Sequence, residues 1–349
     1  MFVGGINIMI TYPKKLEKGD TIGITAPSSG VVEKNKIEKL ENAYANFFML
    51  GYDTMLETAN VRNDNKFVSS DSKTRAKEFM ELWENKEVKW IMPVTGGEFL
   101  MDMLPFIDKE AIKQSTPKWV QGFSDISLLN YYITTNFNIA TVHARNFATY
   151  GIRKLDSTML KTVGILEDAN TSLQESAEFY QGAKIDEKDE LEPYNLTERV
   201  EYKNLKNRQA EKISGRVIGG CIDVLRGLMG TELDNTVNFC EQFKEEGILW
   251  YLENCEMPVT DIYRTLWQMR ESGWFKNSNG FLIGRTASQE TMEDFEYVDA
   301  LNNALGELNV PIIYDVDIGH VAPQWTMING AYGEFEYLDG KGKITQKMI

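Results

Sequence analysis

Histidine is scarce in this chain of 349 residues, and its scarcity limits the chemistry that the protein can perform. The two histidines are His143 and His320, and there is no His-Glu-x-x-His motif and no local cluster of cysteine and histidine. The sequence therefore argues against a zinc site built on several histidines, and we expect no metal ion and no cofactor. A reaction that needs an imidazole base has only these two candidates.

Cysteine is rare as well. Cys221, Cys240 and Cys255 form no Cys-x-x-Cys pair, and their number is odd. A disulfide framework is therefore not expected, and reduced thiols of a cytoplasmic protein are the simpler interpretation.

Positive charge and long apolar runs are also lacking. Lysine and arginine number 37 against 52 aspartates and glutamates, which gives a net charge of −15. This balance disfavours nucleic acids and anionic membranes as partners, because both require a basic face. No run approaches the roughly 18 apolar residues of a membrane span. The apolar N-terminus lacks the basic region and cleavage site of a signal peptide, so we expect a soluble, cytoplasmic protein.

The first part of the chain alternates between sequence patterns typical of strands and of helices. The β-rich run 21–26 precedes apolar residues at helical spacing, and a further strand is expected over 88–94. This order predicts an α/β fold with a parallel sheet covered by helices. We divide the chain into an N-terminal α/β domain (1–150), a highly charged linker and insertion (151–212), and a C-terminal β-rich domain (213–349).

Ser124 lies between an expected strand and an expected helix and follows Gly122. This is the local context of a nucleophile elbow, in which a tight turn presents the hydroxyl at the carboxyl edge of a sheet. The next backbone N–H, that of Asp125, is placed to hold an oxyanion. The second glycine of Gly-x-Ser-x-Gly is missing, and the alternative is that Ser124 and Asp125 merely cap the helix.

Three further positions are candidates for chemistry. Gly96 and Gly97 follow a strand, where paired glycines either let a ligand approach the backbone or simply form a turn. Glu253 ends an apolar strand and is either functional or paired with Arg264. His320 lies in a glycine-containing loop, which favours a functional role. His143 follows a strand and could equally be a satisfied buried histidine.

Motifs along nearly the whole chain resemble the LD-carboxypeptidase family, which also contains the microcin C self-immunity proteins. The matching positions, in chain order, are Pro13, Leu16, Gly19, Asp20 and Ile22; Ala26 to Ser29; Arg75 to Gly97; Gly122 to Asp125; Ile218 to Gly220 with Gly230 and Thr231; Leu252, Glu253, Arg264 and Gly284; and Gly319, His320, Pro323 and Gly330.

The resemblance implies a fold and a mechanism. It implies a flavodoxin-like N-terminal domain with a parallel sheet, a smaller β-rich C-terminal domain, and a homodimer. It makes Ser124 the nucleophile, His320 the base, and Glu253 the residue that orients the imidazole. It also implies an oxyanion hole formed by the backbone N–H groups of Gly97 and Asp125, with the active site in the cleft between the domains.

The substrate is less well defined by the motifs. Gly96, Glu98 and Tyr180 are candidate substrate-binding residues, the last because a tyrosine on the insertion can stack on a nucleobase. Glu98, Cys221 and the segment 143–146 depart from the family's usual residues, which for Cys221 is asparagine. The insertion favours the microcin-immunity branch, with a peptide or an aminoacyl-nucleotide conjugate such as processed microcin C as substrate. The alternatives are a murein tetrapeptide LD-carboxypeptidase of cell-wall recycling and a non-catalytic ligand-binding protein on the same scaffold.

Overall fold

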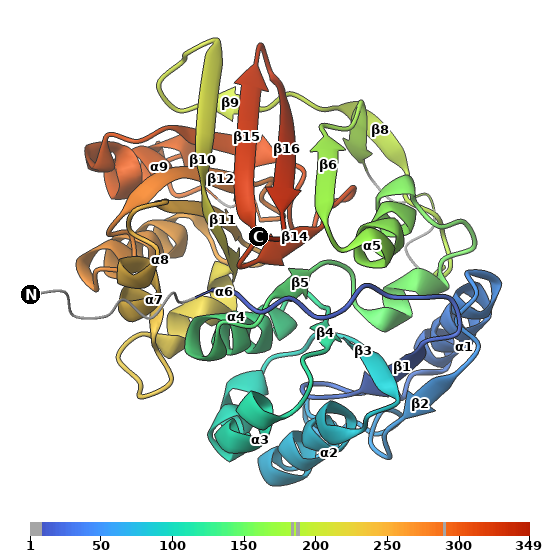
Figure 1. Ribbon diagram of the computed structural model, residues 1–349. Helices are drawn as coiled ribbons and strands as arrows, with labels where there is room; N and C mark the ends of the chain where they lie inside the picture. Colours follow the sequence, from blue (N-terminus) through green and yellow to red (C-terminus); the bar gives the residue numbers. More distant parts are fainter. Residues whose placement is uncertain (1–8, 183–184, 186–188, 289–290) are drawn as a thin grey trace, which may run out of the picture.

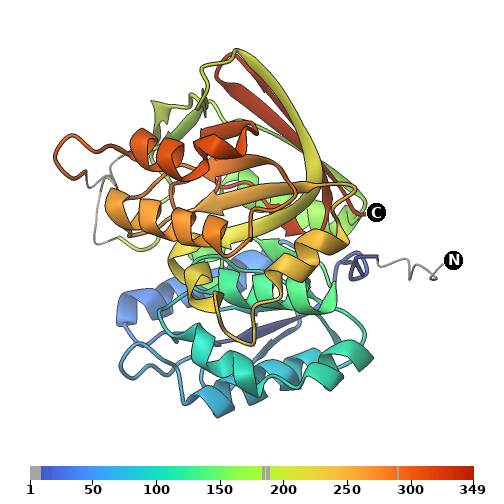
Figure 2. The same cartoon turned by 90° about the vertical axis from the view of Figure 1, so that its left-hand side faces the viewer.

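The computed structural model describes residues 9–182, 185, 189–288 and 291–349. The chain forms two α/β layers, each built on its own sheet (Figure 1). In the side view the N-terminal part lies below the C-terminal part (Figure 2). None of the helices in the described ranges is long and apolar enough to cross a membrane.

The N-terminal sheet has four parallel strands in the order β2-β1-β3-β4. A parallel bridge between Gln121 and Val142 carries this order on to β5. The strands are β1 (Thr21–Thr25), β2 (Met55–Glu57), β3 (Val88–Pro93), β4 (Trp119–Val120) and β5 (Thr141–His143). The helices are α1 (Lys34–Met49), α2 (Ser72–Glu84), α3 (Lys109–Gln114) and α4 (Ile126–Phe137), with 3₁₀ turns η1 (Leu100–Phe106) and η2 (Phe147–Gly151). The expected parallel α/β arrangement is confirmed.

The C-terminal part contains the larger sheet, with eight strands in the order β6-β16-β15-β10-β11-β12-β13-β9. Strands β10 to β13 run parallel to one another, and the other four pair antiparallel. The strands are β6 (Thr171–Glu175), β9 (Lys203–Asn204), β10 (Ala210–Cys221), β11 (Ile248–Glu253), β12 (Ser278–Gly284), β13 (Ile312–Val316), β15 (Tyr332–Leu338) and β16 (Lys341–Lys347).

Several shorter elements complete the C-terminal part. Its helices are α5 (Ser157–Asp168), α6 (Ile222–Leu225), α7 (Thr236–Gln242), α8 (Val259–Glu271) and α9 (Tyr297–Leu305), with 3₁₀ turns η3 (Arg226–Leu228) and η4 (Gly306–Leu308). The remaining strands are β7 (Phe179–Gln181) and β8 (Leu196–Arg199), which pair with each other, and β14 (Met327–Asn329).

The segment 151–212 does more than connect the two parts. It supplies both edge strands of the large sheet, β6 and β9. Strand β6 buries Ser172 and Gln174 and exposes Leu173, the reverse of ordinary amphipathic alternation. The buried Gln174 amide is satisfied by the backbone of Thr326, which donates to Oε1 at 2.8 Å and accepts from Nε2 at 2.7 Å. A polar side chain can occupy this core position because its hydrogen bonds are complete.

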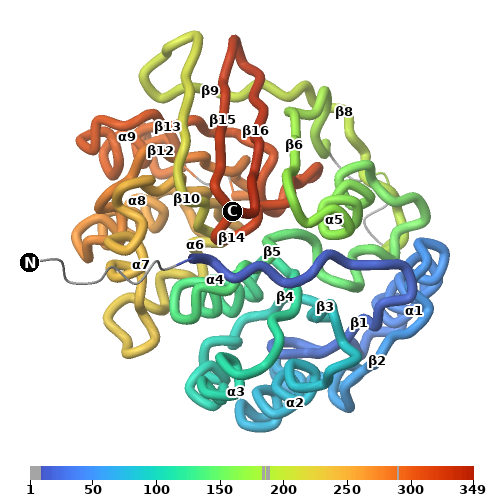
Figure 3. The backbone as a smooth tube through the Cα atoms, viewed as in Figure 1, coloured from blue at the N-terminus to red at the C-terminus, as the bar shows by residue number. Residues whose placement is uncertain are grey.

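The two parts are joined by a strand pair. Strand β5 of the N-terminal part pairs antiparallel with β14 of the C-terminal part, near the centre of the tube view (Figure 3). Asn329 extends this connection: its Oδ1 accepts from Tyr251 Oη at 2.8 Å and from Gly219 N at 3.2 Å, and its Nδ2 donates to Thr141 Oγ1 at 3.2 Å. One buried amide therefore connects β14, β11, β10 and β5.

Asn329→Ala should lower the free energy of unfolding by about 2–4 kcal/mol, because it removes the acceptor of two buried donors, the Tyr251 hydroxyl and the Gly219 N–H. Chemical denaturation measures this as a lower midpoint at an unchanged m-value. The control is Asn238→Ala on α7, an exposed site, where a change within about 0.5 kcal/mol is expected. Equal effects at the two positions would contradict the role of Asn329.

Candidate active site

Ser124 occupies a sharp turn between β4 and α4. Its φ is +61°, a left-handed conformation that is costly for a residue with a Cβ. Gly122 makes the turn possible, because a Cβ there would lie 2.5 Å from Ile126 Cγ2 and 2.7 Å from Asn146 Oδ1. The same Asn146 oxygen accepts from Phe123 N at 3.1 Å. This is the geometry expected of a nucleophile elbow, with the Ser124 side chain half-buried.

The capping alternative for this serine is wrong. Asp125 is the N-cap residue of α4, but its side chain makes no capping hydrogen bond. Its buried carboxylate instead accepts from the hydroxyl of Ser28 and from Leu100 N, the latter at 2.9 Å. Burial raises the pKa of Asp125, and the hydrogen bond from Ser28 opposes this. Asp125 thus ties the elbow to the loop after β1.

The paired glycines lie directly against the elbow. A Cβ on Gly96 would lie 3.1 Å from Ser124 Oγ and 3.6 Å from Asp125 N. Gly97 has φ +151°, and a Cβ there would lie 2.2 Å from Ser28 Oγ. Among the hydrogen bonds of the described residues, neither Gly97 N–H nor Asp125 N–H is a donor. Neither N–H group is therefore taken by another acceptor in these bonds, which is a requirement of the expected oxyanion hole.

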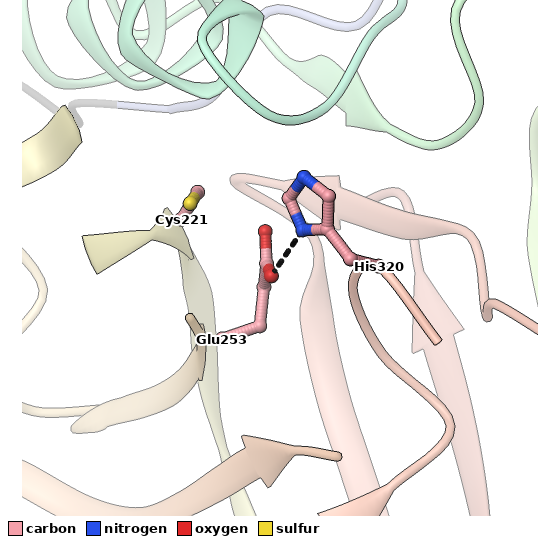
Figure 4. Close-up of side chains that lie close together, drawn as sticks. All are labelled: Cys221, Glu253 and His320. Atoms are coloured by element: carbon pink, nitrogen blue, oxygen red, sulfur yellow. Dashed lines mark hydrogen bonds and ion pairs between the residues drawn. The ribbon is translucent and has the colours of Figure 1, made fainter. Parts of the chain in front are cut away.

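Glu253 and His320 form a buried hydrogen-bonded pair. Glu253 ends β11 and His320 lies in the loop after β13, and Nδ1 of the imidazole is 2.8 Å from Glu253 Oε2 (Figure 4). Because an ionised carboxylate can only accept, Nδ1 donates the proton of this bond, and Nε2 is the nitrogen that Glu253 does not engage. The alternative partner of Glu253 is wrong: Arg264 pairs instead with Asp261 at 2.7 Å, one helical turn away on α8.

Each member of the pair changes the pKa of the other. Burial by itself would raise the pKa of Glu253, but the charge and hydrogen bond of His320 outweigh it and lower the pKa. Burial would likewise lower the pKa of His320, but the charge of the Glu253 carboxylate, with contributions from Cys255 and from the hydrogen bond to Glu253, outweighs this and raises the pKa above the ordinary 6.5. The pair therefore stabilises an imidazolium at His320.

Ser124 and His320 line one cavity of about 440 Å³, together with Gly96, Gly97 and Glu98. No hydrogen bond between Ser124 Oγ and His320 Nε2 occurs among the described residues, and the buried Nε2 has no partner. Catalytic hydrogen bonds are often long before substrate binds. The side chains implied by the family resemblance thus face a common space.

Two other cavities border this one. His320 also lines a cavity of about 330 Å³ with Tyr194, between β7 and η2. Glu98 also lines a cavity of about 430 Å³ whose wall contains Asp223, Glu256 and Asp261. Burial raises the pKa of Glu98, and the neighbouring carboxylates add to this effect.

The expectation for Tyr180 is not supported by its position. Tyr180 is not among the residues that line the cavity of Ser124, and its ring is covered by Arg285, whose Cζ lies 4.2 Å from the ring centroid. Tyr194, on the same insertion, lines the neighbouring cavity instead. Arg145, which the sequence analysis did not single out, stacks between Phe123 and Tyr194 at 4.9 and 5.3 Å. Arg145 belongs to the segment 143–146, which departs from the family's usual residues, and this departure could have pointed to Arg145.

His143 lies behind the pair and is completely buried. Its Nε2 is 4.0 Å from Glu253 Oε1, and its Nδ1 is 3.3 Å from Ser127 Oγ. Burial lowers the pKa of His143 to about 4. A neutral ring without access to the cavity can support Glu253 but cannot exchange protons with a substrate.

Comparisons with known proteins agree with this arrangement. Residues 22–144 match the LD-carboxypeptidase N-terminal domain, and residues 214–335 match the LD-carboxypeptidase C-terminal domain. These matches define the chain as a serine-type carboxypeptidase by class. It belongs to the LD-carboxypeptidase family.

Individual relatives match over almost the whole chain. The Escherichia coli "Microcin C7 self-immunity protein MccF" is 24% identical and covers 96% of this chain and 95% of its own. The Bacillus subtilis "Probable murein peptide carboxypeptidase" is 25% identical and covers 91% and 89%. An MccF-like protein from Bacillus anthracis superposes with a TM-score of 0.80 at 22% identity, over 97% of this chain and 99% of its own. MccF in complex with aspartyl sulfamoyl adenosine gives 0.81 at 21% identity, over 97% and 99%.

Glu253→Gln should lower the pKa of His320 by at least about one unit, because it removes the negative charge that stabilises the imidazolium. The wild-type imidazole keeps its proton to a higher pH than an ordinary histidine, and the variant should lose it at a lower pH. NMR titration of the imidazole signals measures both values. With two histidines in the chain, His143→Ala assigns the signals. An unchanged midpoint in Glu253→Gln would contradict the pairing.

Proposed function

We propose that this protein hydrolyses an amide bond at the carboxyl end of a peptide or an aminoacyl-nucleotide conjugate, with Ser124, His320 and Glu253 as its catalytic triad. The observation that carries the proposal is the shared cavity. Ser124, held at positive φ, and His320 line it together, and Nδ1 of that imidazole is bound to a buried carboxylate.

The chemistry follows from these positions. As Ser124 Oγ attacks the carbonyl carbon, its proton passes to His320 Nε2, and Glu253 stabilises the resulting imidazolium. The carbonyl oxygen becomes negative and accepts hydrogen bonds from Gly97 N–H and Asp125 N–H. The C–N bond then breaks while the imidazolium protonates the leaving nitrogen. Water repeats the sequence on the acyl-enzyme, so that Ser124 and neutral His320 are regenerated.

The conjugate is the leading substrate class. MccF, a relative of this chain, has been solved with aspartyl sulfamoyl adenosine and with adenosine monophosphate. The cavity that shares His320 with the serine cavity has an aromatic wall at Tyr194, and an aromatic wall suits a nucleobase. Because His320 lines both cavities, a conjugate can extend from the serine cavity into the cavity of Tyr194.

A murein tetrapeptide is the second candidate. The acidic cavity beyond Glu98 suits the free amino groups of such a peptide, although the aminoacyl group of a conjugate carries a free amino group as well. A non-catalytic binding role is the third possibility, and it is tested by the triad variants below. A cytoplasmic location, supported by three free thiols among the described residues, and a homodimeric state are further parts of this proposal.

Ser124→Ala and His320→Ala should each lower kcat by about 10⁴- to 10⁶-fold, and the double variant should be little worse than either. The losses are non-additive because the base has no function once the nucleophile is absent. Circular dichroism checks that each variant remains folded. His143→Ala is the matched control and should keep most of kcat. Near-normal turnover in Ser124→Ala, or no turnover in the wild type, would refute the triad.

Aspartyl sulfamoyl adenosine should be hydrolysed with a kcat/KM at least about tenfold above that of a murein tetrapeptide, a difference of about 1.4 kcal/mol. Chromatographic detection of the released products measures both rates under one condition. The Ser124→Ala variant serves as the blank for each substrate. A preference for the tetrapeptide would transfer the assignment to the murein branch and leave the triad unaffected.

A further inference from the structure

Cys221 lies beside the Glu253–His320 pair (Figure 4). It ends β10 as Glu253 ends β11, and the two residues are register partners in the parallel sheet. One ligand atom from each of Cys221, Glu253 and His320 lies within 4.8 Å of the other two. The side chains of Cys221 and Glu253 are buried, and His320 is largely so.

The second feature of this cluster is that its side chains include atoms able to bind a metal ion. Glu253 Oε1 is a buried atom without a hydrogen-bond partner among the described residues, and the His320 nitrogen on the side of the cluster is Nδ1 (Figure 4). The Cys221 thiol donates a weak hydrogen bond to Asp223 Oδ2, with Sγ at 3.5 Å from that oxygen. A buried thiol, carboxylate and imidazole form the donor set that Zn²⁺ prefers, with three protein ligands and an open fourth position. Ligand atoms around tetrahedral zinc are about 3.4 Å apart, so shifts of about 1 Å complete the site.

We propose that Cys221, Glu253 and His320 bind one Zn²⁺ ion, and that the bound ion inhibits the enzyme. Binding by itself does not depend on the catalytic assignment, whereas inhibition rests on the proposed function. On coordination the Cys221 thiol releases its proton to solvent, and the thiolate and the carboxylate become ligands.

Inhibition follows from the imidazole's two nitrogens. His320 needs Nδ1–H to donate to Glu253 and a lone pair on Nε2 to accept the proton of Ser124. If Zn²⁺ binds Nδ1, the ring proton moves to Nε2 and the base is lost. Coordination of Nδ1 therefore blocks proton transfer, and the ion inactivates the triad without binding Ser124.

Cobalt(II) tests the binding independently of activity. Titrating the full-length, reduced protein with Co²⁺ should produce a thiolate-to-cobalt charge-transfer band that saturates at one equivalent and is removed by Zn²⁺. Cys221→Ser should abolish the band. The control is Cys240→Ala, since Cys240 lies in α7, where its Sγ is 3.4 Å from the carbonyl oxygen of Trp274. No band, or a band retained in Cys221→Ser, would overturn the site.

Activity tests the inhibition. Zn²⁺ should inhibit the wild type, a chelator should restore the rate, and Cys221→Ser should raise the inhibition constant at least about tenfold, each variant being compared with its own zinc-free rate. A Cys221-dependent cobalt band in a protein without hydrolase activity would refute the proposed function and retain the site. Loss of activity on chelation, restored by zinc, would refute both the inhibition and the serine mechanism.

Discussion

The buried carboxylate of Glu253 is the constraint on which the active site depends. A charge at this depth is costly unless it is paired, and His320 supplies the pairing hydrogen bond at 2.8 Å. The surrounding backbone makes room for it: a Cβ on Gly319 would lie 2.5 Å from Glu253 Oε2, and one on Gly284 would lie 2.8 Å from its Cβ. The same contacts therefore determine the space around the Glu253 carboxylate, the pairing of its charge and the orientation of the His320 ring. The imidazole is held in one orientation before any substrate arrives.

The proposed nucleophile, Ser124, comes from the other half of the molecule and is held by different means. Ser124 depends on backbone strain at the elbow, and this strain is maintained by the packing of α4 and by the Asp125 network with Ser28 and Leu100. Strain at a single residue persists only where its surroundings determine it fully. The position of the Ser124 hydroxyl thus depends on four segments: the loops after β1 and β3, the end of β4 and the start of α4.

Local patterns were sufficient to predict the α/β order and to single out Ser124, Glu253 and His320. They failed wherever partners come from distant segments. The nearby Arg264 was a reasonable partner for Glu253 by sequence separation, yet the true partner is 67 residues away. Strand β6 escaped prediction because its buried side chains are polar and depend on contacts with Thr326. Cys221 joins the site through strand register alone, which no spacing in the sequence reveals.

The pairing of β5 with β14 has a consequence for how substrate enters. Because three residue pairs join the two halves in register, rotating one half away from the other would break ladder hydrogen bonds next to His143. Hinge opening of the kind seen in loosely connected two-domain enzymes is therefore costly here. We therefore expect access to depend on the segments that line the cavity, such as the loop that carries Phe67 and the one before Gly97, and not on separation of the two halves.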